Sequence, residues 1–247
     1  MFENLQNSHG EILDCSYAAA NVTRRPPRVV EGQAELVVIG HGVTGNKDRE
    51  WAVMLASVLN AAGFATLRFS FSGNGDSQGR FEDSCPSKEV ADLNAVLNAC
   101  ENWHVTFVGH SMGAAVGVIC ASQNARIKRL ISLAGMVHTG NFAQRKFGDL
   151  QAGVDCMWEK PECPLSQTFL DDMRQIDTVL PLTKTITVPW LLVHGTHDDV
   201  VPIQESLQIA EQALPNSQLT TLTGSDHVFS DDAMHGMALS VLNWLDS

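Results

Sequence analysis

The sequence predicts an α/β fold, in which a doubly wound, mostly parallel sheet carries helices on both faces and a small lid insertion. Three observations lead to this prediction. The chain has 247 residues, of which 44% are hydrophobic, and this is enough for one large core. Short continuous apolar runs recur, as is typical of strands buried on both faces. Between them lie stretches with apolar residues at helical spacing, and this alternation indicates a parallel sheet.

The elements can be assigned in chain order. Residues 34–39 form an apolar run that ends at Gly40, and a helix is expected to follow at 47–61, closed by Gly63. The opening residues, up to about Arg28, are predicted to form a hairpin that begins the sheet. Further strands are expected at 65–71, 104–108, 129–134, 189–193 and 218–222, and further helices at 86–101, 111–123, 203–214 and 231–245.

One stretch interrupts this alternation. Residues 135–187 contain Gly, Pro, Cys, Trp and Phe without a clean period, so we expect an insertion over the sheet, and long excursions of this kind are usually functional lids. No repeat or linker indicates a second unit. Residues 1–247 are therefore predicted to form a single domain, with 135–187 as a lid within it.

The charge of the chain disfavours several kinds of partner. Lys and Arg number 16 against 28 Asp and Glu, a net charge of −12, which would be repelled by nucleic acid and by an anionic membrane. The first residues lack a basic start and an apolar core, and no run approaches a membrane span of about 18 residues. We therefore expect a soluble cytoplasmic protein, and a homodimer is left open.

The six cysteines contain no CxxC pair, which argues against a zinc ribbon or a thioredoxin-type redox motif. We expect free thiols. A disulfide between Cys156 and Cys163 is the alternative, and a reducing compartment disfavours it.

Two segments fit the pattern G-x-S-x-G, around Ser77 and around Ser111. A nucleophilic serine needs a sharp strand-to-helix turn, with flanking glycines where neighbouring elements come too close for a Cβ. The strand predicted at 104–108 leads straight into the motif that holds Ser111, and a stretch of small residues typical of a packed helix follows it. Ser77 is separated from its strand by a loop, and no such helix follows it. The context favours Ser111.

A serine nucleophile needs a general base and a carboxylate that orients the base. The run 189–193 leads to Asp198, and the run 218–222 leads to His227, so an acid and an imidazole each follow a strand, in the required order. Asp199 and Asp226 are alternative acids. His235 is an alternative base, but it lies within the last predicted helix.

Two further features concern the same loops. A metal site is an alternative use of the acids and histidines here, although a strand-end loop would not bring two such histidines together as a helical pair does. The residues considered for a metal are His194, His197, Asp198, Asp231, Asp232 and His235.

Acyl transfer needs backbone N–H donors for the developing oxyanion, and we expect these from Val43 and from Met112, which opens a helix.

Taken together, these motifs resemble the α/β-hydrolase superfamily, from about Leu36 to the end of the chain. Residues 73–82 and 225–231 are similar to segments of small bacterial carboxylesterases, related to the cinnamoyl and feruloyl esterases and the serine aminopeptidase group. This resemblance implies the same nucleophile, acid, base and oxyanion donors. In the feruloyl branch an aromatic residue often replaces Val43. The motifs are His41-Gly42-Val43, Gly73-x-Gly75-x-Ser77, Gly109-His110-Ser111-Met112-Gly113, His194-Gly195-x-x-Asp198-x-x-Val201-Pro202 and Gly224-Ser225-Asp226-His227.

The predicted function is hydrolysis of a small-molecule carboxylic ester through an acyl-enzyme on Ser111, with no cofactor and no metal. The alternatives are a thioesterase, a peptidase or amidase, a C–C hydrolase or a lyase with the same residues, and a non-catalytic binding protein on this fold. His41, Phe142 and Trp158 are candidate substrate-binding residues. Several apolar residues of the insertion either line the substrate pocket or pack it onto the core: Met136, Phe142, Phe147, Met157, Trp158 and Phe169.

Overall fold

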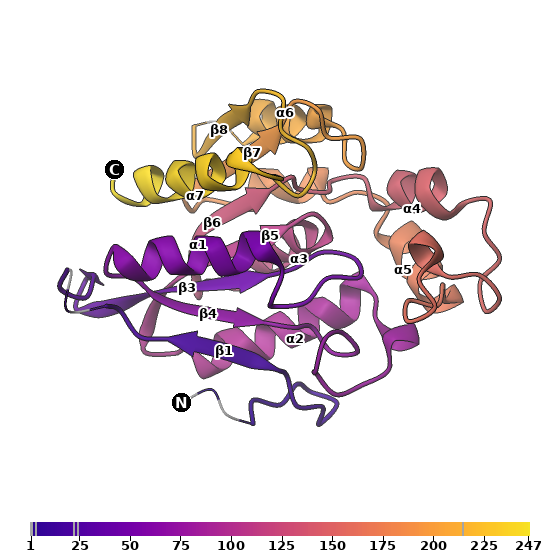
Figure 1. The fold of residues 1–247 in the computed structure, drawn as a ribbon, viewed down its shortest axis with the longest axis horizontal. Helices are drawn as coiled ribbons and strands as arrows, with labels where there is room; N and C mark the ends of the chain where they lie inside the picture. The colour runs from indigo at the N-terminus through magenta and orange to yellow at the C-terminus, as the bar shows by residue number, and fades with distance from the viewer. Residues whose placement is uncertain (1, 3, 22, 24, 214) are drawn as a thin grey trace.

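A computed structural model describes residues 2, 4–21, 23, 25–213 and 215–247. Within these residues the chain forms an eight-stranded sheet, in which β3 to β8 run parallel in the order β4-β3-β5-β6-β7-β8 (Figure 1). The predicted α/β class is therefore confirmed. The strands are β1 (Cys15–Ala18), β2 (Val29–Val30), β3 (Gln33–Gly40), β4 (Ala65–Phe69), β5 (Trp103–His110), β6 (Ile127–Leu133), β7 (Trp190–Gly195) and β8 (Ser217–Leu222).

Helices cover both faces of the sheet, and each face has its own hydrophobic core. In Figure 1, α1 and α7 lie over one face, while α2 and α3 lie behind the sheet. The central strands β3 and β5 are almost entirely buried, which fits the mostly apolar stretches from which they were predicted. The helices are α1 (Glu50–Ala61), α2 (Pro86–Ala99), α3 (Met112–Gln123), α6 (Ile203–Gln212) and α7 (Asp232–Leu245).

Boundaries differ from the predicted ones by up to three residues, and Leu214, the predicted end of the fourth helix, lies outside the described residues. None of the helices in the described part of the chain is both long and apolar enough to cross a bilayer.

The start of the sheet differs from the predicted hairpin. Strand β1 pairs antiparallel with β4 at the edge of the sheet, whereas β2 pairs antiparallel with β3. The hairpin thus joins β2 to β3 through Glu31 and Gly32, which have φ values of 52° and 82°. Positive φ at both turn residues is the geometry that suits two-residue hairpins. β1 and β2 make no pair with each other because each finds a partner further along the chain.

The insertion carries α4 (Thr139–Phe147) and α5 (Gln167–Ile176), which pack against each other beyond the carboxyl ends of the strands (Figure 1). A separate apolar cluster holds them together. The last part of the predicted insertion is different, because Val179 and Ile186 are buried in the hydrophobic core on the face of the sheet that α2 and α3 cover. The cap over the sheet is therefore shorter than residues 135–187. The division of the chain into domains stays a prediction.

All six cysteines are free thiols. Cys156 pairs with Pro164 in an isolated antiparallel bridge, and the Met157 N–H donates to the Cys163 carbonyl over 2.8 Å. Cys156 and Cys163 are therefore offset by one residue across this pair of segments, on opposite faces. The alternative of a disulfide between them has no support.

Candidate active site

Ser111 lies at the junction of β5 and α3, in a strained backbone conformation. Its φ and ψ are 53° and −119°, a backbone conformation that residues other than glycine rarely adopt. Ser111 is also the N-cap residue of α3. Its N–H donates to the Leu133 carbonyl over 2.9 Å, and its own carbonyl accepts from the Met136 N–H over 3.0 Å. The neighbouring strand β6 thus holds the turn in place. This is the sharp strand-to-helix turn that the sequence predicted around Ser111.

Two glycines of the motif are required by close backbone approaches. A Cβ on Gly113 would lie 2.2 Å from the His41 carbonyl oxygen, and a Cβ on Gly109 would lie 2.3 Å from the Gly113 carbonyl oxygen. Neither contact is possible without movement of the backbone. Gly113 therefore allows the loop after β3 to pack directly on the turn that presents Ser111, and Gly109 allows the end of β5 to lie against the start of α3.

Asp198 and His227 come together from the loops after β7 and β8. The Nδ1 atom of His227 lies 2.8 Å from Oδ2 of Asp198, which is fully buried. Oδ1 of Asp198 accepts hydrogen bonds from the Val200 and Val201 N–H groups at 2.9 and 2.8 Å. A carboxylate facing Nδ1 places the proton there, which leaves Nε2 of His227 as an acceptor.

The protonation of Asp198 follows from these contacts. Burial alone would raise its pKa, but hydrogen bonds from His194 and His227 outweigh burial and hold the pKa of Asp198 below its usual value. The side chain is thus an anion at neutral pH, as an acid that orients a histidine must be.

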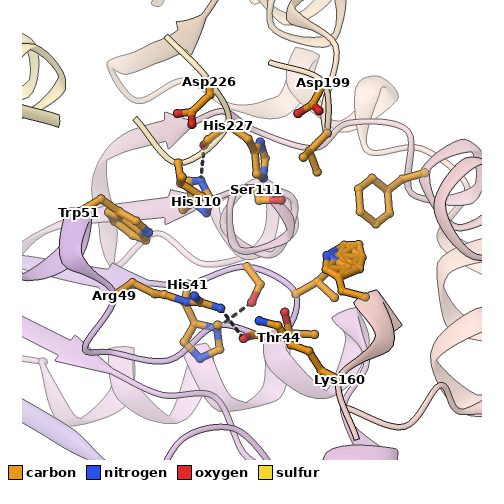
Figure 2. A pocket seen from close by; sticks show the side chains of 17 residues that line it. His41, Thr44, Arg49, Trp51, His110, Ser111, Lys160, Asp199, Asp226 and His227 are labelled. Atoms are coloured by element: carbon orange, nitrogen blue, oxygen red, sulfur yellow. Dashed lines mark hydrogen bonds between the residues drawn. The ribbon is translucent and has the colours of Figure 1, made fainter. Parts of the chain in front are cut away.

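Ser111 and His227 line the same cavity, of about 350 Å³, and Figure 2 shows the two side chains next to each other. The structure thus brings Ser111 and His227 to one pocket, and Asp198 is buried outside its wall, where it contacts His227. Most of the exposed surface of the wall is apolar, but nine of the seventeen lining residues have polar or charged side chains. The cavity is lined by His41, Gly42, Val43, Thr44, Gly45, Arg49, Trp51, His110, Ser111, Phe142, Trp158, Lys160, Asp199, Val200, Asp226, His227 and Val228.

Val43 and Met112 flank this pocket. Val43 belongs to its wall, and both residues line a narrow cavity beside it. Among the described residues, neither N–H donates a hydrogen bond within the protein. Met112 is the first residue of α3, where the helix leaves N–H groups unpaired and the helix dipole favours negative charge.

The comparisons with known proteins fit this geometry. A family model described as alpha/beta hydrolase fold matches residues 35–160. The chain belongs to the α/β-hydrolase family. It is 22% identical over 218 residues to the mitochondrial palmitoyl-protein thioesterase ABHD10 of Pongo abelii, covering 83% of this chain and 70% of the relative.

Two solved structures share the hydrolase fold. Est1E from Butyrivibrio proteoclasticus, with ferulic acid bound, has a TM-score of 0.84 at 24% identity, covering 98% of this chain and 96% of that one. Alpha/beta hydrolase domain-containing protein 10 from mouse has a TM-score of 0.75 at 19% identity, covering 96% and 95%. The predicted resemblance to esterase-like α/β-hydrolases is confirmed.

The alternative residues of this hydrolase have other roles or positions. The Ser77 hydroxyl donates to the Ser70 carbonyl and accepts from the Asp14 N–H, so Ser77 fastens the N-terminal segment to the loop after β4. His235 is exposed on α7 and does not line the pocket. Asp226 lines the pocket but accepts two hydrogen bonds from Ser230.

The loop residues considered for a metal are used differently. His194 bonds to Ser206 and to the Val201 carbonyl, at 2.7 and 3.0 Å. In the part of the chain that the structure describes, no group of three or more His, Cys, Asp or Glu is placed to hold a metal ion. The metal alternative therefore has no support.

Three residues were candidates for substrate contact. His41 is buried at the pocket wall, and both of its nitrogens are engaged, with the Gly42 carbonyl at 2.9 Å and the Phe71 N–H at 3.0 Å. It therefore holds the loop after β3 rather than offering a free nitrogen. Phe142 and Trp158 also line the pocket, and Trp158 is 37% exposed and packs on Phe147.

The remaining insertion residues belong to the apolar cluster of the cap. Met136 and Phe147 are buried there, and they line none of the cavities described for this site. Met157 and Phe169 line the narrow cavity beside Val43 and Met112. Most of the six apolar residues therefore pack within the cap, which is one of the two roles considered for them from the sequence.

Two histidines that were not identified from the sequence, His194 and His110, contact Asp198 and His227. Nε2 of His194 lies 3.1 Å from Oδ2 of Asp198, so His194 positions that carboxylate. His110 contacts the His227 carbonyl at 2.9 Å and packs between His227 and Trp51, with ring centroids 4.8 and 4.9 Å apart. The only available signal was that His110 and His194 stand inside the motifs that hold the proposed catalytic residues.

The buried histidines His41 and His110 should make the stability of the fold sensitive to acid. Burial lowers the pKa of His41 to about 4 and that of His110 to about 3, and the positive charge of Arg49 adds to both shifts. Unfolded histidine titrates near 6.5, so below that pH the unfolded state binds protons that the folded state does not. The contribution of each neutral histidine to the free energy of unfolding is therefore fully present above about pH 6.5. It decreases as the pH falls, by about 2 kcal/mol for each histidine at about pH 5.

Urea unfolding at about pH 8 and about pH 5 measures this effect. Glu89 acts in the opposite direction, because burial and the charge of Asp92 raise its pKa well above the usual value. The test therefore compares variants. His41→Gln should reduce the difference between the two pH values by about 2 kcal/mol, whereas the same change at exposed His235 should leave it unaltered. An unchanged difference in His41→Gln would contradict the prediction.

Proposed function

We propose that this protein is a serine hydrolase that cleaves carboxylic esters through an acyl-enzyme on Ser111. The observation that carries the proposal is the strained turn that presents Ser111 in the pocket where His227 is held by buried Asp198. A nucleophile, a base and an acid that orients the base form the arrangement that acyl transfer requires.

The first half of the reaction acylates the serine. The Ser111 hydroxyl oxygen attacks the ester carbonyl carbon while Nε2 of His227 takes its proton. The oxyanion that forms accepts hydrogen bonds from the N–H groups of Val43 and Met112. The bond from the carbonyl carbon to the alcohol oxygen then breaks, and His227 gives its proton to the leaving alcohol.

The second half releases the acid. Water loses a proton to His227 and attacks the acyl carbon, the bond to the Ser111 oxygen breaks, and the proton returns to that oxygen. Asp198 stays ionised throughout and stabilises the charged imidazole of each step. The net reaction converts one ester and one water into one acid and one alcohol.

The proposal is tested by active-site labelling together with a substrate panel. A fluorophosphonate probe should label the folded protein at Ser111, as located by peptide mass spectrometry, and the protein should hydrolyse 4-nitrophenyl esters of short acids. The panel also includes a thioester and an aminoacyl amide of the same acyl length, because the ABHD10 relative is named as a thioesterase. No labelling and no hydrolysis of any class would overturn the proposal.

A further inference from the structure

We propose that the natural ester carries an anionic group, in the simplest case a carboxylate, which Arg49 and Lys160 bind inside the catalytic pocket. This inference rests on the proposed function and specifies its substrate class. Both cations line the pocket, in a chain whose net charge is −12. Neither forms a salt bridge with any acid in the described part of the chain, although both are only partly exposed.

The two cations lie on one side of the pocket. Figure 2 shows Arg49 and Lys160 with Thr44 between them, and His110, His227 and Asp226 across the cavity. Arg49 comes from the N-terminus of α1 and Lys160 from the cap, so core and cap each supply one charge. The site would therefore be complete only when the cap is in place over the sheet.

Arg49 is fixed in place while most of its donors stay available. Its Nη2 donates to the Thr44 carbonyl over 2.7 Å, directly after Val43, one of the proposed oxyanion donors. A guanidinium has five N–H donors, and its planar fork matches a carboxylate. An anion bound there would lie on the Val43 side of Ser111, within the pocket rather than in bulk solvent.

The edge of the cap adds positive charge near the same opening. Arg145 and Lys146 of α4 donate to the Val200 and Asp199 carbonyls over 2.8 and 2.9 Å, and neither forms a salt bridge with a described acid. Asp199 is exposed and also lines the pocket, so negative charge is present at the rim. Cations that gather at a concave site attract and orient an anionic substrate in spite of the overall charge.

The inference is tested by matched pairs of esters. On the acyl side, mono-4-nitrophenyl glutarate is compared with 4-nitrophenyl pentanoate, and on the alcohol side, 4-carboxyphenyl butyrate with 4-methylphenyl butyrate, each after subtraction of the uncatalysed rate. The readout is the ratio of kcat/KM for the anionic ester over its neutral partner. In at least one pair, the ratio should fall about tenfold or more in the double variant Arg49→Gln with Lys160→Gln. The pair that responds tells which part of the ester carries the charge.

Controls separate charge from structure. Arg49→Lys keeps the charge but loses the planar fork, so it should lower the ratio less than Arg49→Gln does. Lys184→Gln, at an exposed residue away from the pocket, should leave the ratio unchanged. Lys160→Gln alone should lower the ratio even if changes at Arg49 disturb α1. Raising the salt concentration should also lower it in the wild type.

Two failures can be told apart. Hydrolysis of neutral esters with ratios that the double variant does not alter would overturn the anion site and leave the proposed function standing. Absence of hydrolysis in both pairs, together with no labelling of Ser111, would instead overturn the proposed function.

Discussion

Replacing Ser111 with Ala is expected to lower kcat/KM for ester hydrolysis by at least about 10⁴-fold. The reason is that this change removes the only atom that can form the acyl-enzyme, while the base and its carboxylate stay in place. The backbone should tolerate it, because alanine and serine meet the same steric cost at a φ of 53°. Fluorophosphonate labelling should disappear together with the ester rate, while circular dichroism stays unchanged.

The chain offers a matched control for this experiment. Ser77 lies in the second G-x-S-x-G segment, so Ser77→Ala makes the same chemical change in the same local sequence pattern. Its hydroxyl joins the Ser70 carbonyl to the Asp14 N–H, so its loss should cost about 1–2 kcal/mol of unfolding free energy and leave the ester rate near that of the wild type. A rate that survives in Ser111→Ala and falls in Ser77→Ala would show that the wrong serine was chosen.

The sheet and the proposed catalytic residues could be predicted because local sequence determines them. A strand buried on both faces is mostly apolar, so β3, β5 and β7 stand out in the sequence even though β3 contains Glu35 and β5 contains His104 and Thr106. The turn at Ser111 requires glycines where backbones approach within van der Waals distance, and these glycines are visible in the sequence. Residues at the ends of parallel strands then fall at one edge of the sheet.

The remaining features depend on contacts between distant segments. β1 has only four residues, is partly exposed, and is defined by its pairing with β4 some 50 residues later, so its own composition says little. Val179 and Ile186 look like the rest of the insertion until the fold buries them in the core and packs the 3-10 helix between them, Leu180–Thr185, against α3 and α6. His194 acts through Asp198 only because the loop after β7 turns back on itself. Arg49 and Lys160 are 111 residues apart in the sequence, and they line one pocket only because the cap lies over the sheet.

Asp198→Asn is expected to lower kcat by about 10⁴-fold without removing the nucleophile. The hydrogen bonds around Asp198 determine how an asparagine would sit. Two backbone N–H groups, from Val200 and Val201, point at Oδ1, so the amide oxygen must take that place and the amide NH₂ must face the histidines. Nδ1 of His227 would then accept a hydrogen bond, and its proton would move to Nε2, the atom that should take the proton of Ser111.

This wrong tautomer distinguishes Asp198→Asn from Ser111→Ala. Fluorophosphonate labelling of Ser111 should become slow rather than disappear, because the hydroxyl is present but no longer deprotonated by His227. Asp232→Asn, at an exposed residue in the first turn of α7, makes the same chemical change away from the pocket and should keep the wild-type rate. If Asp198→Asn retained the wild-type kcat while remaining folded, the 2.8 Å contact with His227 would have no part in catalysis, and the base would have to be oriented by another group.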